Sequence, residues 1–408
     1  MSIFEINTYN MRKTQLIFYV IALIGIIPSV KAQITGGGVT PVGTTVDDDR
    51  NVITTAMPFL LISPDSRSAG MGDAGVALSP DANAMQWNAA RLAFVENEIG
   101  ASVSYSPWLT KIGVNDMSIS YLSGYYRIGQ EQVIGLSMKY FDLGSIFFTD
   151  TGVQGDGLEA SPKDFSIAAA YSRKLSDNFS AALTARFVRS NLFGDYQGSN
   201  LEDPKPATAI GVDVGLFYTK PVLFNGNESE FSSGLQISNI SNKVTYSNDD
   251  NEQFLPINLR LGTAFTTALD PYNTLTFTVD LNKLMVPTPD PNDTSSSNIT
   301  LLEGMFGSFG DAPGGAQEEL REISIASGVE YWYNKIFAVR TGYFYEHVSK
   351  GGRQYFTAGL GFRYQVLGLD FSYLIPTKQQ NPLAETLRFT ATFSLENINR
   401  SGSDSVTE

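Results

Sequence analysis

Residues 134–140 read Ile-Gly-Leu-Ser-Met-Lys-Tyr, and this stretch decides the fold class of the chain. Successive side chains of a β-strand point to opposite faces of the sheet. As a strand, the stretch has an apolar face and a face of small or charged residues, with Ile134, Leu136, Met138 and Tyr140 on the first and Gly135, Ser137 and Lys139 on the second. It predicts a strand whose charged residue shares no face with the bulky apolar residues.

The same alternation recurs along the chain from Ile99 onward. About fourteen stretches carry it, an even number as closure of a bacterial antiparallel barrel requires. They read IGASVSY, MSISY, IGLSMKY, FSIAAAY, FSAALTARF, IGVDVGLFY, FSSGLQIS, INLRLGTAF, LTFTVDLN, ISIASGVEY, FAVRTGYFY, FTAGLGFRY, LDFSY and LRFTATFSL. An aromatic content of 12% and 37 glycines agree with strands joined by many turns. The sequence therefore predicts an all-β protein.

Charged residues indicate which face of these strands meets lipid. They alternate with the large apolar residues, at Lys139, Arg186, Asp213, Arg260, Asp280, Arg340, Arg363, Asp370 and Arg388. Each would cost about 2–4 kcal/mol on the lipid face near the bilayer midplane, whereas a lumen lets them pair. A soluble β-sandwich with apolar side chains turned inward tolerates the same alternation and stays open as the alternative. Mixed charges and aromatic strand ends favour a transmembrane antiparallel β-barrel over residues 99–396.

Connections of alternating length predict how the barrel is oriented. Short connections such as DPYN and YNK separate long ones at residues 141–164, 189–206, 241–254 and 283–321. In outer-membrane barrels the periplasmic turns are short and the extracellular loops are long. We therefore expect the long loops outside the cell, and residues 33–98 with the tail 397–408 in the periplasm or barrel mouth. Residues 99–105 and 387–395 are expected to pair and close the barrel.

The first 32 residues predict a secretory signal peptide. Two cations at residues 12–13 precede an apolar run at residues 16–27, and residues 30–32 are suited to cleavage. The run is too short to span a bilayer as a helix. Met11 lies beside the cations and is an alternative start. The mature chain is therefore expected to be exported.

Composition excludes several classes of function. The chain has no cysteine, which excludes disulfides, a thiolate metal site and a thiol nucleophile. Its formal net charge of −14 becomes −16 without the three cations and one anion of the signal peptide. This acidity argues against nucleic acid as a partner. No later stretch approaches the roughly twenty apolar residues of a spanning helix, so the membrane has to be crossed by strands.

A glycine cluster raises the possibility of a nucleotide site. The stretch SRSAGMGDAGV has the spacing of a dinucleotide-binding turn at Gly70, Gly72 and Gly75. That turn requires a strand directly before it and a helix directly after it. Here the preceding apolar run ends too early, and the next helix start comes too late. We therefore interpret the glycines as a tight loop.

Residues 33–98 precede the first strand and are compact enough to plug a barrel lumen. The glycine cluster is followed by an alanine-rich stretch, PDANAMQWNAARLA at residues 80–93, which predicts a helix. The three glycines are expected to need backbone conformations or close contacts that larger residues cannot adopt. The prediction is a small N-terminal helical plug inside the barrel.

Catalytic and metal chemistry have little support in the sequence. His347 is the only histidine and lies in a predicted exposed loop, without the serine or carboxylate arrangement of a hydrolase. The acidic stretches VDDDRN, SNDDNEQ and DPNDTSSSN offer oxygen ligands for Ca²⁺ but lack the EF-hand positions, and we interpret them as solvated loops. We expect no enzymatic activity, cofactor or metal.

Bulky apolar residues inside the long polar loops are candidates for partner binding. They are Trp108, Ile146, Phe147, Phe148, Leu192 and Phe193. Exposed hydrophobic groups on an outer surface are typical of a protein-binding surface. The alternative is that these loops fold over one another and bury the residues. Both interpretations are open from the sequence.

Two segments resemble the PorV family of type IX secretion barrels, which is related to the FadL fatty-acid transporters. They read FLLISPDSRSAGMGDAGVALSPDANAMQWNAARLA and FLPINLRLGTAF, and the resemblance covers essentially the whole mature chain. Its most specific elements are the plug residues Gly70, Met71, Gly72, Asp73, Gly75, Trp87 and Asn88. Relatives often have Trp-Asn-Pro-Ala where this chain has Trp-Asn-Ala-Ala. The resemblance implies that the glycines belong to the plug.

The resemblance also implies a function and partners. Family members bind the C-terminal signal domain of secreted cargo, take cargo from the SprA translocon and deliver it to the PorU sortase, alongside PorQ and PorZ. The alternative from another class is FadL-like passage of hydrophobic small molecules. A plugged lumen with paired charges favours the first, and an apolar tunnel favours the second. A structural surface protein is a third class that no residue supports.

Overall fold

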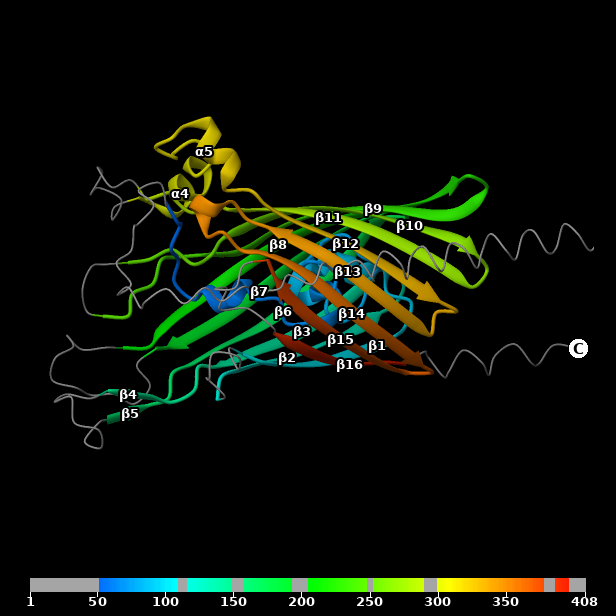
Figure 1. Cartoon of the computed structure of the whole chain (residues 1–408), viewed down its shortest axis with the longest axis horizontal. Helices are drawn as coiled ribbons and strands as arrows, with labels where there is room; N and C mark the ends of the chain where they lie inside the picture. The colour runs from blue at the N-terminus through cyan, green and yellow to red at the C-terminus, as the bar shows by residue number, and fades with distance from the viewer. Residues whose placement is uncertain are drawn as a thin grey trace, which may run out of the picture. The chain divides into compact units, whose positions relative to one another are not determined.

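The computed structural model describes residues 51–108, 116–148, 158–192, 205–247, 252–289, 299–377 and 386–395. Residues 49–408 form one compact unit. Fourteen of its strands close into an antiparallel barrel (Figure 1), which confirms the predicted fold class. No helix within the described ranges is long and apolar enough to cross a membrane. The predicted signal peptide and C-terminal tail lie outside the described residues.

The barrel strands follow one another around the wall in chain order. They are β1 (Ile99–Pro107), β2 (Ser118–Ile128), β3 (Gln132–Asp142), β6 (Lys163–Ser176), β7 (Phe179–Asn191), β8 (Ala207–Phe224), β9 (Asn227–Ser241), β10 (Asn258–Asp270), β11 (Asn273–Leu284), β12 (Ser324–Tyr333), β13 (Phe337–Tyr345), β14 (Gln354–Tyr364), β15 (Leu367–Pro376) and β16 (Leu387–Leu395). Strands β4 (Ile146–Phe148) and β5 (Leu158–Ala160) form a separate two-stranded sheet. Strand β3 therefore pairs with β6.

The barrel closes where the sequence predicts. Strand β1 pairs antiparallel with β16, so that Ile99 lies opposite Leu395 and Tyr105 opposite Phe389. A closed barrel pairs every backbone group between strands and leaves no edge, which is why it can cross a bilayer. Because a slip by one residue would turn every side chain to the other face, the alternation sets this register.

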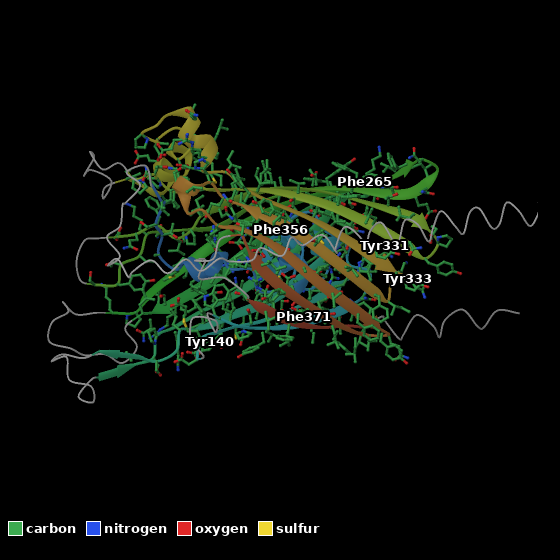
Figure 2. The ribbon with its side chains drawn as sticks, in the orientation of Figure 1. Tyr140, Phe265, Tyr331, Tyr333, Phe356 and Phe371 are labelled. Atoms are coloured by element: carbon green, nitrogen blue, oxygen red, sulfur yellow. The ribbon has the colours of Figure 1, made fainter. Side chains whose placement is uncertain are left out.

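The two faces of the wall are occupied as predicted. On β3, Leu136 is 59% exposed on the outside, whereas Lys139 is 1% exposed in the lumen. The other predicted lumenal charges are buried, except that Arg363 is part-exposed. Figure 2 shows outward side chains around the wall, including the labelled Phe356 and Tyr333. An apolar face turned outward rules out the β-sandwich alternative.

The connections alternate in length, as predicted. One end of the barrel carries tight turns, such as Asn225-Gly226 between β8 and β9, where both φ angles are positive at 51° and 80°. This is the conformation of a two-residue hairpin turn that matches strand twist. The long connections at the other end carry α4 (Leu301–Gly307), α5 (Ala316–Arg321) and η5 (Val348–Lys350). In Figure 1, α4 and α5 lie at the left, and the tight turns at the right.

The remaining helical elements precede β1. They are η1 (Pro58–Leu61), α2 (Ser66–Ala69), α3 (Ala84–Trp87) and η2 (Ala89–Phe94). The prediction of one helix at residues 80–93 is therefore wrong. Asn88 interrupts it with an extended backbone at φ −162° and ψ 99°. Its side-chain oxygen accepts from the Ala90 N–H at 3.1 Å, so the asparagine caps a second, separate helical turn.

Candidate functional site

Residues 56–95, called here the lumenal segment, lie inside the barrel and are almost entirely buried (Figure 1). The segment is tied to strands around the wall. Its Ser66 N–H donates to Thr390 on β16 at 2.9 Å. The Gly75 and Val76 N–H groups donate to the same Asp280 oxygen on β11, at 2.6 and 2.9 Å. Backbone groups that a loop would otherwise leave unsatisfied are thus paired by the wall.

The glycine cluster allows the lumenal segment to lie directly against strand backbones. Gly72 has a φ of 71°, and a Cβ there would lie 2.6 Å from both Ser327 O and Tyr343 N. Its N–H donates to Thr357 at 2.8 Å. A Cβ on Gly75 would overlap the Trp87 ring. A Cβ on Gly70, which has an ordinary φ, would lie 3.2 Å from the Gly359 Cα.

The other residues of the family motif are placed by the same packing. Met71 is fully buried and lies against the Gly328 backbone of β12. Asp73 has a φ of 64°, and its Oδ2 accepts from the Tyr355 hydroxyl at 2.6 Å. Asn88 donates to Leu216 O on β8 at 2.9 Å. The structure therefore places Gly70, Met71, Gly72 and Asp73 against β12 to β14, and Asn88 against β8.

Trp87 is held by a buried carboxylate. Its indole N–H donates to Asp65 Oδ1 at 2.6 Å, and Asp65 Oδ2 accepts from the Ser68 N–H at 2.9 Å, capping α2. Burial, together with the nearby Asp81 carboxylate, raises the pKa of Asp65, although these hydrogen bonds act in the opposite direction. The same ring lies under the Arg260 guanidinium, 5.1 Å from the ring centroid.

A chain of ion pairs connects the lumenal segment to the wall. Arg67 contacts Glu330 at 2.9 Å, and Glu330 also accepts from Arg340 at 2.6 Å. Arg340 pairs with Asp370 at 2.7 Å, and Asp370 in turn with Arg363 at 2.6 Å. This chain of charges is therefore paired, as the mixture of signs along the strands predicts, whereas Lys139 donates to the backbone oxygens of Leu60 and Ile62 instead. Such buried pairs are costly to break, because the remaining charge stays desolvated.

A cavity of about 430 Å³ remains on the long-loop side of the lumenal segment. Its walls come from residues 52–62, from Asp73 and Trp87 further along the lumenal segment, and from the ends of β10 to β14. Asp73, Trp87 and Arg260 line it at depth, whereas Val52 and Arg353 are exposed at its mouth. The volume lies within the range of about 300–1,000 Å³ typical of small-ligand sites.

For Trp108, the structure decides between exposure and burial, the two interpretations that the sequence left open. Its side chain is 7% exposed and lies edge to face with Phe141, at 6.1 Å between ring centroids. It belongs to a hydrophobic cluster that also contains Phe59 and Leu255. The alternative, in which the loop regions bury their own apolar residues, holds for this one. A ring covered in this way presents no surface to a partner.

The other predicted loop residues are only partly described. Leu192 is 39% exposed at the end of β7. Ile146, Phe147 and Phe148 form β4, but their side chains lie outside the description, as does the whole of Phe193. Their role in partner binding stays a prediction.

An apolar surface on the β11–β12 connection was missed by the sequence reasoning. Leu302, Phe306, Phe309 and Leu320 are exposed on or beside α4 and α5, with Phe306 at 67% and Leu320 at 70%. The signal in the sequence is the capping box formed by Thr300 and Glu303, which starts α4. This surface lies at the long-loop end of the barrel (Figure 1).

His347 is half-buried and not fully exposed as predicted. Its Nδ1 accepts from the Ser349 N–H at 3.2 Å and caps η5, which assigns it a local structural role. In the described parts of the chain, no three His, Asp or Glu side chains are placed to hold a metal ion. The acidic stretches lie mostly outside the described residues.

These features define a class of protein. A closed antiparallel barrel with an apolar outer face and a charged lumen is an integral outer-membrane β-barrel. The family model for the type IX secretion system protein PorV matches residues 45–291, and the chain belongs to this family. It is therefore an outer-membrane component of type IX secretion. No curated protein sequence matches the chain significantly.

Solved barrel structures are similar to the chain at low identity. The toluene transporter TodX of Pseudomonas putida is 11% identical with a TM-score of 0.45, over 81% of this chain and 97% of that chain. The toluene transporter TbuX of Ralstonia pickettii is 10% identical with a TM-score of 0.43, over 81% and 97%. A FadL homologue of Pseudomonas aeruginosa is 13% identical with a TM-score of 0.42, over 85% and 100%. These likenesses assign no function.

Proposed function

We propose that this protein carries secreted cargo at the cell surface. It binds the C-terminal signal domain of cargo, receives the cargo from the SprA translocon, and delivers it to the PorU sortase together with PorQ and PorZ. The observation that carries the proposal is the filled lumen, in which residues 56–95 are hydrogen-bonded and ion-paired to the wall. A barrel filled in this way is suited to presenting surfaces rather than to conducting protein.

The orientation supports binding at the long-loop end. In outer-membrane barrels the long connections face the outside and the tight turns face the periplasm. The apolar residues of α4 and α5, and Leu192 at the end of β7, then face the cell exterior, where cargo arrives. Because lipid does not cover that end, these side chains gain free energy when a partner buries them.

The second candidate is passage of a hydrophobic small molecule, as in FadL-like transporters. The cavity of about 430 Å³ is the observation that favours it. A transporter also needs a path past the lumenal segment, whose residues 84–93 are buried against β3, β6, β7 and β8. Carriage of cargo requires no such path and no catalytic group, so we do not propose an enzymatic activity.

Recovery of partners from detergent-solubilised outer membranes tests the proposal. A tagged chain should recover cargo signal domains together with SprA, PorU, PorQ or PorZ. A deletion strain should accumulate unprocessed cargo, while its uptake of hydrophobic compounds stays normal. Loss of uptake with normal secretion would instead identify the transporter.

A further inference from the structure

An apolar groove crosses the outer wall of the barrel from β7 to β11. Its volume is about 390 Å³. Two short side chains, Ser233 and Thr263, lie opposite each other within it, on β9 and β10. Bulky residues surround this pair, namely Phe179, Leu216, Tyr218, Leu235, Leu261, Val279 and Leu281. Because neither short side chain fills the space between its neighbours, the wall is hollowed at this place.

The groove faces the bilayer. On β10, Leu261 is 44% exposed on the outside, whereas the neighbouring Arg260 is 4% exposed in the lumen. Thr263 is exposed on the same face as Leu261, and Phe265, labelled in Figure 2, follows it on that face. The outer face of a membrane barrel contacts lipid rather than water. A hollow on this face is therefore filled by hydrocarbon or by another membrane protein.

One end of the groove reaches the level of the lipid headgroups. Tyr218 lies opposite Phe179, the first residue of β7. The polar turn at residues 176–178 precedes Phe179, and the Asn178 carbonyl accepts from the Thr219 N–H at 2.9 Å. Aromatic residues next to polar turns mark the boundary between hydrocarbon and water. Since the tight turns of such barrels face the periplasm, the groove begins at the boundary of the periplasmic leaflet.

Lys220 places a cation at this end of the groove. It follows Tyr218 by two residues on the same face of β8, so the two Cα atoms are about 7 Å apart. It is exposed, and within the described ranges it forms no ion pair. Phe231 lies opposite Lys220 on β9, so no carboxylate occupies the paired position. A lysine near the membrane surface increases the affinity for an anionic lipid about fivefold.

These features select an amphiphile as the ligand. The apolar groove matches an acyl chain, and the ammonium group of Lys220 matches a phosphate at the polar end of that chain. A phospholipid supplies both. It is the resident amphiphile of a bilayer leaflet, so it meets the groove at a far higher concentration than a free fatty acid does. A partner barrel would cover the apolar rim but would bring no phosphate to Lys220.

We propose that the groove between β7 and β11 binds a phospholipid of the periplasmic leaflet. One acyl chain lies over Ser233 and Thr263, and the phosphate contacts Lys220. The site goes beyond the proposed function and does not depend on it, because it lies on the lipid-facing wall rather than on the long loops.

The test measures lipid binding to the full chain by native mass spectrometry after release from detergent. The protein is titrated with phosphatidylglycerol and, separately, with diacylglycerol that carries the same acyl chains. One phosphatidylglycerol should stay bound per chain, and its phosphate should make it bind about fivefold more tightly than diacylglycerol. Lys220→Gln should remove this difference. Lys335→Gln, at an exposed tight-turn lysine outside the groove, should preserve it.

A second variant fills the groove. Replacing both Ser233 and Thr263 by leucine should weaken binding of both lipids about tenfold, since less of the acyl chain is buried. Thr341→Leu is the matched control, because Thr341 is exposed on the outer face of β13 and does not line the groove. Heat-modifiable migration on gels shows which variants fold. If the double variant does not fold, Ser233→Leu alone takes its place.

The outcomes decide between the possible occupants. Unchanged lipid affinity in the folded groove variant overturns the proposal. Equal affinity of the unmodified protein for phosphatidylglycerol and diacylglycerol overturns the phosphate contact and with it the phospholipid. Displacement of phosphatidylglycerol by an equal concentration of dodecanoate would identify a fatty acid instead. Loss of a membrane partner from the groove variant, without lipid bound to the unmodified protein, would identify a protein interface. Normal recovery of cargo by variants that lose lipid supports a separate lipid site and leaves the proposed function intact.

Discussion

At the scale of single residues, glycines determine how closely the lumenal segment packs against the barrel wall. Gly72 combines a left-handed backbone with contacts to the backbones of β12 and β13. The motif residues Asp73 and Asn88 use polar atoms to contact β14 and β8, respectively. These close contacts require glycine at the motif positions. The glycine spacing therefore matches that of a nucleotide-binding turn, although the strand and helix of such a turn are not formed.

Replacing Gly72 by valine should reduce barrel assembly strongly. The Cβ would lie 2.6 Å from two backbone atoms, and the φ of 71° is unfavourable for a β-branched residue. Heat-modifiable migration of membrane fractions measures the folded share. Gly129→Val is the matched control, since Gly129 has a φ of 72° but no neighbour within 4 Å. It should lose only about 1–2 kcal/mol and still assemble. Nucleotide affinity in the unmodified folded protein would contradict this explanation.

Glu330 is the link between the lumenal segment and the wall, because it contacts both Arg67 and Arg340. Glu330→Gln should lower the free energy of unfolding by about 3–5 kcal/mol, since Arg67 and Arg340 each lose one of two carboxylate partners. Urea denaturation in detergent micelles measures the change. The exposed pair Arg173–Glu131, at 3.8 Å, provides the control. Arg173→Gln should change stability by at most about 1 kcal/mol. Equal losses of unfolding free energy in the two variants would show that the buried ion pairs stabilise the protein no more than the exposed pair does.

At the scale of elements, the β11–β12 connection forms a separate small module of α4 and α5. Four ion pairs attach α5 and the following Glu322 to neighbouring segments, from Lys350 to Glu318 and Glu322, and from Lys283 to Glu319 and Glu322. On α4, Leu302 and Phe306 stay exposed, whereas Met305 is buried. Ion pairs therefore attach the module to the barrel, and its exposed apolar side chains form a hydrophobic surface.

The attachment of α5 should depend on pH. Burial would raise the pKa of Glu318, but hydrogen bonds from Lys350, Gly314 and Asn51 outweigh it, and the pKa falls below the ordinary 4.5. A depressed pKa stabilises the folded form above about pH 4.5, and this contribution is lost as the pH falls through the folded value. The hydrogen-exchange protection factors of residues 316–321, taken relative to the intrinsic rate at each pH, should therefore be lower at pH 3 than at pH 7. Unchanged protection would show that the ion pairs do not hold the helix.

Substitution of both Leu302 and Phe306 by serine should weaken partner recovery without affecting the barrel. Burying two such side chains contributes roughly 3–6 kcal/mol at about 1.5–3 kcal/mol each, enough to dominate a modest interface. Leu223→Ser is the matched control, because Leu223 is exposed at the tight-turn end of β8. A second double variant, Leu192 and Phe193 to serine, tests the other loop predicted to bind partners. Normal recovery with all variants would exclude both loops as binding surfaces.

At the scale of the whole molecule, the outward apolar wall and the closed strand order determine behaviour in solution. The folded chain should need detergent, show β-rich circular dichroism, and migrate faster before heating than after heating. The physical reason is that a closed barrel keeps every strand hydrogen-bonded and resists dodecyl sulfate until heated. A monomer that stays soluble without detergent would contradict the assignment to the membrane.

Much of the candidate site could not be predicted from the sequence. The alternation identified the lumenal charges, and the motif identified the residues of the lumenal segment. Neither revealed that Trp108 is covered by Phe141, or that α4 and α5 expose an apolar surface. Burial of a loop residue depends on which other loop lies over it, and local pattern carries no such information.

By itself, the sequence determined the fold class, the number of strands and the closing pair, because side-chain alternation is a local property that repeats in every strand. Only the tertiary structure decided which charges form direct ion pairs. Arg67 and Glu330 form an ion pair across 263 residues, whereas Arg260 on the same lumenal face lies over the Trp87 ring and donates to the Gln86 carbonyl. The physical reason is that ion pairing depends on distances across the lumen, which are set by barrel closure and by the path of the lumenal segment.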